Sequence, residues 1–247
     1  MSVNVKNEIH KNQLCLNSNH RIPEHIFQAY SQIIFFDCET TGLKSKTDKI
    51  IELAASKISV SGTSDFMDSF VAIDDATPLP AIVTQITGIT REYLCKHGIT
   101  EQELVKQFLE FVETDGKTLF VAHNANFDLL FLLEMLKRNK CKLQDWDAID
   151  TLTVFKDRSK YPHKLADAIR YYKLNEVQNS HLAREDVNAL SAVFFEMIEE
   201  CDDLHKYINL FGMHPKGLDI ERIPGIIYHV QQFRSKTKLY DLVHVMT

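Results

Sequence analysis

The fold of this chain is decided by one stretch, Ile33-Ile34-Phe35-Phe36-Asp37-Cys38-Glu39-Thr40-Thr41-Gly42-Leu43. Its apolar first part is typical of a strand that is buried on both faces of a sheet. Because side chains alternate along a strand, Asp37 and Glu39 project from one face, with carboxyl groups close enough to share an ion. Gly42 permits the turn that follows. Acidic residues also end strands at a solvated edge, so a metal site here depends on partners elsewhere in the chain.

The rest of the chain alternates strand-like and helix-like segments. Further strands are expected at 50–58, 66–73, 118–122 and 146–149. Helices are expected at 22–32, 81–86, 91–96, 100–114, 128–139, 150–155, 162–172, 184–200 and 204–211. A meander of three strands, followed by strands interleaved with helices, indicates an α/β protein with a mixed five-stranded sheet flanked by helices.

Length and composition indicate one globular body with additions at both ends. The chain has 247 residues, of which 45% are hydrophobic, and this is enough for a sizeable core. We divide it into an N-terminal arm (1–30), a main domain (31–203) and a C-terminal extension (204–247). There is neither an apolar run of about 18 residues nor a secretory signal, so we expect a cytoplasmic protein without a membrane partner.

The cysteines are too scattered to form a recognisable framework. Their odd number and the lack of a CxxC pair argue against both a disulfide framework and a structural zinc site. We expect reduced thiols at Cys15, Cys38, Cys95, Cys141 and Cys201.

The charge of the chain does not by itself indicate a nucleic-acid partner. The formal net charge is −6, whereas phosphate binding normally depends on Lys and Arg. The residues from 204 onward carry a net charge of +3, so the preceding part carries −9. An acidic body can still bind a polyanion if its carboxylates hold divalent cations, which invert the local charge.

Further acidic residues begin two of the expected helices. Asp128 opens the helix that follows the 118–122 strand, and Asp186 lies at the start of the helix at 184–200. His181 falls in the loop before that helix, since the five residues that separate it from Asp186 turn a helix by about 500°. A simple N-terminal charge and a surface histidine are the alternative interpretations.

Electrostatics decides whether such carboxylates can gather. Two unit charges about 4 Å apart repel by about 4 kcal/mol at an effective dielectric constant of about 20, and four carboxylates make six such pairs. Divalent cations remove this repulsion. The all-oxygen set of Asp37, Glu39, Asp128 and Asp186 favours two Mg²⁺ or Mn²⁺ ions over zinc. With His181 able to take a proton near neutral pH, such a site is equipped for attack of water on a phosphodiester.

Three segments resemble the motifs of the DnaQ-like DEDDh exonucleases, in particular the proofreading epsilon-type subunits and exonuclease domains of bacterial replicative polymerases. The first motif is matched by Phe36-Asp-Cys-Glu-Thr-Thr-Gly-Leu43, the second by Val121-Ala-His-Asn-Ala-Asn-Phe-Asp128, and the third, of His-x₄-Asp form, by His181-Leu-Ala-Arg-Glu-Asp186. Ile50-Ile-Glu-Leu-Ala54 and Ile86-Thr-Gly-Ile-Thr90 are similar to connecting segments of that family. The resemblance identifies 31–203 as a DEDDh exonuclease domain.

The resemblance implies a ribonuclease-H-like fold and release of nucleoside 5′-monophosphates from 3′ ends. It implies that Asp37, Glu39 and Asp186 hold the metal that activates water, and that Asp37 bridges to a second metal. Asp128 then binds through or beside water, and His181 is the general base.

The resemblance also implies contacts with the substrate. Thr40 and Thr41 are expected at the terminal 3′-hydroxyl, and Leu43 is expected to pack against the terminal base, which any base permits because each offers a π-face. Ile89 and Asn124 are further candidates for substrate binding.

The favoured function is that of a metal-dependent 3′→5′ exonuclease at single-stranded or frayed DNA ends, in proofreading or repair. The same chemistry on RNA, as in relatives that trim small RNAs, stays open because nothing in the sequence reports recognition of the 2′-hydroxyl. A polymerase-associated scaffolding module is the other alternative, although the set of ligands is complete. By resemblance to epsilon-type proteins, the extension, with its apolar and basic run at 226–245, is a candidate contact for a DNA polymerase subunit.

Overall fold

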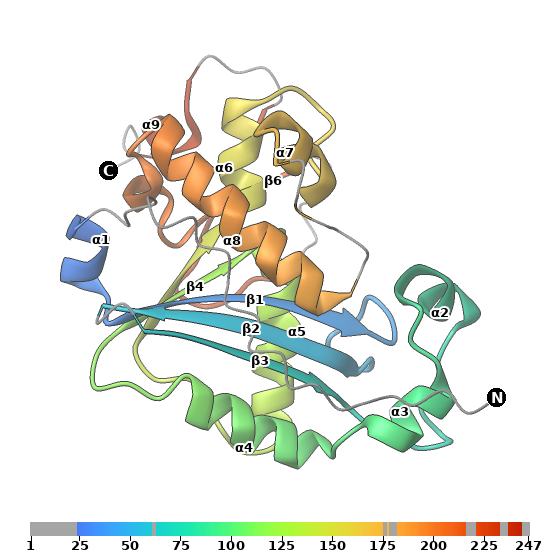
Figure 1. Cartoon of the computed structure of the whole chain (residues 1–247). Coiled ribbons are helices and arrows are strands. Elements are labelled where there is room, and N and C mark those ends of the chain that lie inside the picture. The colour runs from blue at the N-terminus through green and yellow to red at the C-terminus, as the bar shows by residue number, and fades with distance from the viewer. Residues whose placement is uncertain are drawn as a thin grey trace.

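A mixed five-stranded sheet forms the centre of the protein, with strands in the order β3-β2-β1-β4-β5 (Figure 1). The computed structural model describes residues 24–60, 63–174, 177, 182–215, 221–232 and 237–243. The strands are β1 (Gln32–Thr40), β2 (Ile50–Ser59), β3 (Ser64–Phe70), β4 (Thr118–Ala122), β5 (Trp146–Asp150), β6 (Leu210–Met213) and β7 (Ile227–Val230). The helices are α1 (Glu24–Ala29), α2 (Ala81–Thr87), α3 (Arg91–His97), α4 (Glu101–Phe111), α5 (Ala125–Arg138), α6 (Thr151–Arg158), α7 (Leu165–Tyr171), α8 (Ala183–Glu200), the 3₁₀ helix η1 (Leu204–Tyr207) and α9 (Leu239–Val243).

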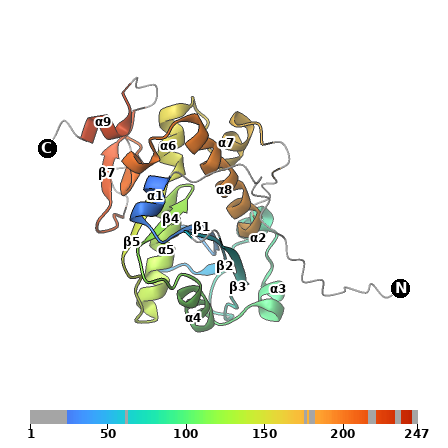
Figure 2. The same cartoon turned by 60° about the vertical axis from the view of Figure 1, so that its left-hand side comes forward.

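β1 lies in the middle of the sheet and contributes side chains to two hydrophobic cores. Ile33 and Phe35 are buried on the face covered by α6, α7 and α8, where the Phe35 and Phe194 rings meet edge-on with centroids 5.2 Å apart. Ile34 and Phe36 are buried on the opposite face, against α4 and α5. Figure 2 shows these helices on the two sides of the sheet. The apolar run of β1 is therefore buried on both faces, as its sequence predicts.

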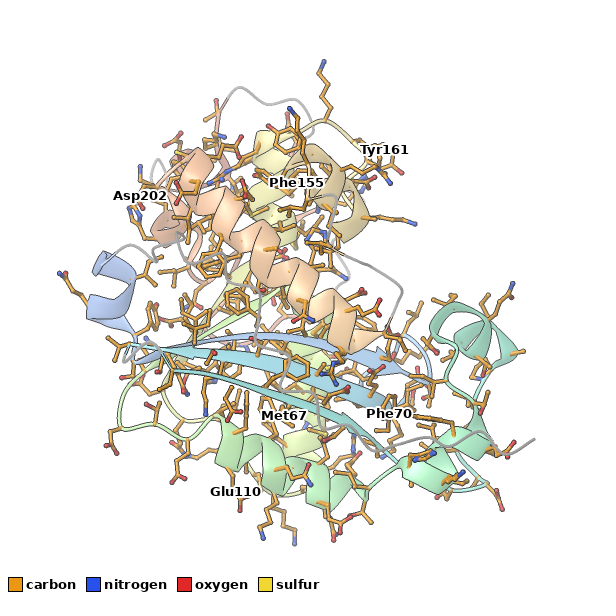
Figure 3. All side chains as sticks on the ribbon, in the orientation of Figure 1. Met67, Phe70, Glu110, Phe155, Tyr161 and Asp202 are labelled. Carbon is orange, nitrogen blue, oxygen red and sulfur yellow. The ribbon has the colours of Figure 1, made fainter. Side chains whose placement is uncertain are left out.

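The same alternation directs the acidic end of β1. In Figure 3, Met67 of β3 lies between the sheet and α4, while Phe155 of α6 lies in the core on the other side. Asp37 and Glu39 are in step with Phe35, so they project on the face that α8 covers. The carboxylates at the end of β1 thus face the start of α8.

Strand direction brings the ends of β1 and β4 to one edge of the sheet. β1 is antiparallel to β2 and parallel to β4, with Phe35 opposite Val121, and β5 is parallel to β4. Parallel strands end at the same edge, so α5, which follows β4, begins beside the acidic end of β1. The expected mixed five-stranded sheet with flanking helices is confirmed.

The helix expected at 204–211 is wrong in its second half. A 3₁₀ helix ends at Tyr207, and Asn209 adopts a positive φ of 54°, which no regular helix contains. The Asn209 N–H donates to the carbonyl of Ala148 at 2.8 Å, and its side-chain oxygen accepts the Ala148 N–H at 2.9 Å. Asn209 thus pairs with the edge of β5 and turns the chain into β6, which is parallel to β7.

Part of the C-terminal extension is tied to α6 by the Asp157 carboxylate. This group accepts hydrogen bonds from the Tyr207 hydroxyl (2.9 Å), the Gln231 side-chain amide (2.7 Å) and the Leu239 backbone N–H (2.6 Å). Leu239 is also buried in the same core as Ile33 of β1. The described residues of the extension therefore pack on the body of the protein.

No helix within the described ranges is long and apolar enough to cross a membrane. The described cysteines, Cys38, Cys95, Cys141 and Cys201, are free thiols, as expected. Cys15 lies outside the described residues.

Candidate active site

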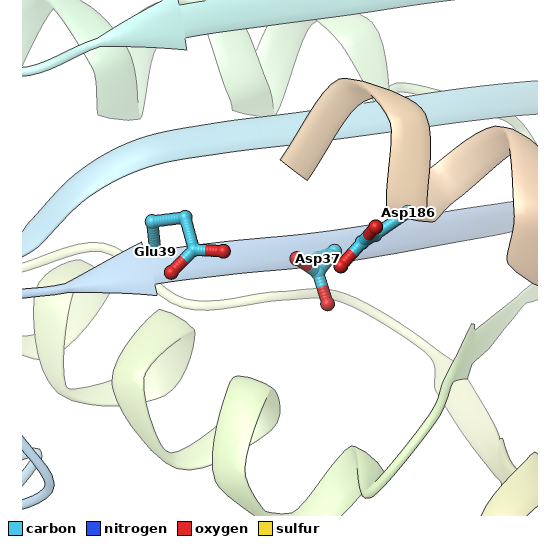
Figure 4. A group of neighbouring side chains, drawn as sticks. All are labelled: Asp37, Glu39 and Asp186. Carbon is cyan, nitrogen blue, oxygen red and sulfur yellow. The ribbon is translucent and has the colours of Figure 1, made fainter. Parts of the chain in front are cut away.

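Three carboxylates meet where the start of α8 crosses the end of β1. Asp37 and Glu39 come from β1 and Asp186 from the first turn of α8, and one oxygen of each lies within 4.8 Å of the others. Figure 4 shows Asp186 pointing from α8 toward Asp37, with Glu39 further along the strand. Among the described residues, no other group of three acidic, His or Cys side chains is arranged in this way. His181 lies outside the described residues, so its role stays a prediction.

Asp128 occupies a separate, buried position beside the same strand. Its side chain is 3% exposed, and its Oδ1 accepts the backbone N–H of Cys38 at 3.1 Å. The start of α5 is fixed by the Asp150 carboxylate, which accepts the N–H groups of Asn124 (2.9 Å) and Ala125 (3.1 Å). Asp128 is therefore held next to the three-carboxylate group without belonging to it.

The acids of the site hold their protons more tightly than ordinary acids. Burial, followed by the charges of Asp186 and Glu52, raises the pKa of Asp37 to about 8. Burial, followed by the charge of Asp37, raises the pKa of Glu39 to about 9. Burial and the charge of Asp37 also raise the pKa of Asp128 well above its ordinary value. The repulsion expected among gathered carboxylates is thus present, and a divalent cation would relieve it.

The raised pKa values predict that the metal-free protein loses stability as pH rises. Between about pH 4, where free carboxylic acids ionise, and the raised values of about 8 for Asp37 and about 9 for Glu39, the folded state binds more protons than the unfolded state. In EDTA, the free energy of unfolding should therefore fall by roughly 1.4 kcal/mol per pH unit for each group that stays protonated.

Urea unfolding in EDTA at about pH 5, 7 and 9 measures this slope. Asp37→Asn should reduce the slope, because it removes one of the two groups, and saturating Mg²⁺ should restore stability most strongly at the highest pH. A stability that stays constant or rises with pH in EDTA contradicts the prediction.

Two threonine side chains, from the last residue of β1 and the first residue after it, stabilise the turn that follows. The Thr40 hydroxyl donates to the Gly42 carbonyl at 2.6 Å, and the Thr41 hydroxyl accepts the Lys49 N–H at 3.0 Å. A Cβ at Gly42 would lie 2.4 Å from a carboxylate oxygen of Asp48, so a larger residue there would displace that side chain. The Thr40 hydroxyl keeps its acceptor lone pairs and the Thr41 hydroxyl keeps its O–H donor, so both can still meet a terminal 3′-hydroxyl.

The other substrate candidates lie in different surroundings. Leu43 is 84% exposed, and Asn124, at the start of α5, is also exposed and has a positive φ of 75°. Both line a cavity of about 570 Å³ beside the loop. Ile89 is only 3% exposed and packs with Ile51 and Leu94 in a small core. The structure thus brings Leu43 and Asn124 to one hollow and buries Ile89.

Glu52 is a residue of the site that the sequence did not single out. It lies opposite Glu39 in the pairing of β1 with β2 and is 1% exposed. Its charge adds to those that raise the pKa values of Asp37 and Glu39. The available signal was a single acid within the apolar run 50–55.

A mixed sheet in this strand order, with a central strand that ends in carboxylates and meets a helical aspartate, defines the class of ribonuclease-H-like nucleases. Comparison with known proteins identifies a family within this class. A family model described as "Exonuclease" matches residues 34–194. The chain therefore belongs to the exonuclease family, and the resemblance to the exonuclease domains of bacterial replicative polymerases is confirmed.

Two of the relatives to which this chain is similar are PolC-type DNA polymerases. PolC-type DNA polymerase III of Latilactobacillus sakei is 34% identical over 185 residues, which are 73% of this chain and 12% of that protein. PolC-type DNA polymerase III of Caldanaerobacter subterraneus is 30% identical over 224 residues, which are 86% of this chain and 15% of that protein. The chain thus spans a small part of the length of these relatives.

Solved structures support the fold. Escherichia coli exonuclease I in complex with a dA16 oligonucleotide aligns with a TM-score of 0.62 and 19% identity, over 72% of this chain and 42% of that chain. Cell-death related nuclease 4 aligns with a TM-score of 0.59 and 16% identity, over 69% of this chain and 64% of that chain. At these identities the likeness concerns the fold alone.

Proposed function

We propose that the protein is a metal-dependent 3′→5′ exonuclease that hydrolyses phosphodiester bonds at DNA ends. The observation that carries the proposal is the meeting of Asp37, Glu39 and Asp186 in a chain of the exonuclease family. DNA is favoured as substrate because the relatives are PolC-type DNA polymerases and exonuclease I is bound to single-stranded DNA. Proofreading or repair in the cytoplasm is part of the same proposal.

The residues present fit two Mg²⁺ or Mn²⁺ ions. All donors of the group are carboxylate oxygens, which suit these hard cations, and burial and mutual repulsion raise the pKa values of Asp37 and Glu39, so their ionised forms lack a counter-charge. Bound ions would supply the positive charge that attracts and polarises a phosphodiester. Asp37, Glu39 and Asp186 would hold them, with Asp128 acting through or beside water.

The remaining residues have roles around the ions. His181, which precedes α8 in the sequence, takes the proton of the attacking water and must be neutral to do so. Leu43 packs against the terminal base, since its exposed side chain lines the same cavity as Asn124. Thr40 and Thr41 meet the terminal 3′-hydroxyl with their backbone and side chains, since the Thr41 hydroxyl, which accepts the Lys49 N–H, still has its own O–H to donate.

A 3′-mismatched primer-template, labelled at the 5′ end, tests the proposal when incubated with Mg²⁺, Mn²⁺ or EDTA. The expected result is a metal-dependent ladder that shortens from the 3′ end, faster for DNA than for an RNA strand of the same sequence. Equal or faster degradation of RNA would overturn the DNA assignment and keep the chemistry. No degradation of either strand would overturn the proposal and favour a scaffolding role.

We also propose that the C-terminal extension contacts a DNA polymerase subunit. The relatives are polymerases, and Ile227 of β7 is an exposed apolar side chain in the run 226–245. Deleting the extension would also remove partners of Asp157, so Ile227→Asp is the cleaner change. This variant should keep its stability and lose co-purifying polymerase, and unchanged co-purification would remove the proposal.

A further inference from the structure

The first turn of α8 carries Asp186 but receives no cap from its own sequence. The N-cap residue is Leu182, which has no side-chain acceptor, and the helix begins without a side-chain capping hydrogen bond. The first N–H groups of a helix require partners from outside it. α8 therefore depends on another element to fix its start.

Glu52 of β2 lies where those partners are needed. It is 1% exposed, and the backbone N–H groups of Ala183 and Arg184 lower the pKa of its carboxylate, which burial and the charge of Asp68 raise. Its Oε2 is buried without a hydrogen-bond partner among the described residues. β3 holds the same turn from the side, because the Arg184 guanidinium lies 3.8 Å from the Asp68 carboxylate and 5.0 Å from the centre of the Phe66 ring. Two strands thus fix the orientation of one helical turn.

We propose that Glu52 is the positioning residue for Asp186, a role that rests on the proposed function of the three-carboxylate group. Ala183 and Asp186 are one turn apart, and the Asp186 N–H bonds to the Leu182 carbonyl at 3.1 Å, so fixing the helix start fixes Asp186. Glu52 lies opposite Glu39 in the pairing of β2 with β1. This pairing fixes the position of Glu52 along the sheet relative to Asp37 and Glu39. The cap therefore comes from the strand that pairs with the strand of Asp37 and Glu39.

Charge repulsion by itself would disfavour a glutamate at position 52. A buried acid beside Asp37 and Glu39 adds to the repulsion of the metal-free group. The two N–H groups offset part of that repulsion, since a carboxylate at a helix N-terminus is stabilised by hydrogen bonds and the helix dipole, and burial and Asp68 still leave the pKa of Glu52 raised to about 7. Glu52→Gln separates the two effects, because it keeps an acceptor oxygen and removes the charge.

The test compares the full chain carrying Glu52→Ala, Glu52→Gln or Glu199→Ala. Glu199, exposed at the far end of α8, is the matched control. Three quantities are measured: Mn²⁺ affinity by calorimetry, amide hydrogen exchange at 183–187, and kcat and KM on a DNA 3′ end. Glu52→Ala should weaken Mn²⁺ binding or lower kcat by about 10- to 100-fold, with KM nearly unchanged. Its amides at 183–187 should also exchange faster, while Glu52→Gln stays close to wild type.

A double-mutant cycle identifies the residue through which Glu52 acts. In an Asp186→Asn background, Glu52→Ala should cause little further loss of Mn²⁺ affinity, because the ligand that it positions is already gone. Additive losses, or identical behaviour of Glu52→Ala and Glu52→Gln, would overturn the proposal. If Glu52→Ala does not fold, Glu52→Asp, which withdraws the carboxylate by one methylene, takes its place. Because affinity and exchange need no substrate, a failure of the nuclease assignment is seen separately, as wild-type protein that leaves DNA intact.

Discussion

Replacing Asp37 by Asn is expected to lower kcat on a DNA 3′ end by about 10³-fold or more. Asp37 shares the carboxylate group with Glu39 and Asp186, so the change removes charge from the centre of the ligand set. The amide has nearly the same shape as the carboxylate, and packing is preserved.

Stability should move in the opposite direction. Burial and the charge of Asp186 raise the pKa of Asp37 to about 8, which means that its ionised form destabilises the metal-free protein. Asp37→Asn in EDTA should therefore unfold at a higher urea concentration than wild type, by a margin that grows above about pH 4 and is complete above the raised pKa of about 8. Such a gain in stability with a loss of activity is typical of a site whose charges serve function.

Single-turnover kinetics and urea midpoints measure both effects. Asp75→Asn, an exposed acid in a loop, is the matched control and should change neither. A kcat within about tenfold of wild type would show that Asp37 is not a required ligand. A loss of both activity and stability would instead indicate a structural role.

The part of the site that follows local rules was predictable from the sequence. The alternation along β1 placed Ile33 to Phe36 in two cores and directed Asp37 and Glu39 to a single face. The end of β4 and the start of α5 were visible as an apolar strand followed by a polar turn, and parallel strands bring such ends together. Hydrophobic periodicity and strand direction therefore account for the sheet edge at which Asp37, Glu39 and the start of α5 lie.

The rest depends on contacts between distant segments, which no local pattern reports. The bonds between Glu52 and the start of α8 join a strand near the beginning of the domain to a helix near its end. The sequence pattern at 204–211 is helical, but the chain turns at Asn209 because this residue pairs with Ala148. A tertiary contact thus overrides local helix propensity. Ile89 could be placed near the site only by resemblance, and its burial follows from packing with α3.

Replacing His181 by Ala is expected to lower kcat by about 10²- to 10⁴-fold, the usual contribution of a general base. The metal ligands are carboxylates, so Mn²⁺ affinity should stay close to that of wild type. Calorimetry and single-turnover rates at saturating Mn²⁺ measure the two quantities. His20→Ala, in the N-terminal arm, is the control for loss of a histidine as such.

The pH profile then distinguishes a base from a ligand. Wild-type activity should rise between about pH 6 and 8, because His181 must lose its proton, with an ordinary pKa of about 6.5, before it can accept one. The acids of the site also release protons when metal binds, and this would produce a similar rise at limiting metal. Saturating Mn²⁺ removes that contribution, so the rise that persists belongs to the base and should be absent in His181→Ala. If the variant keeps the rise and binds Mn²⁺ more weakly, His181 acts on the metal site and the proton acceptor is another group.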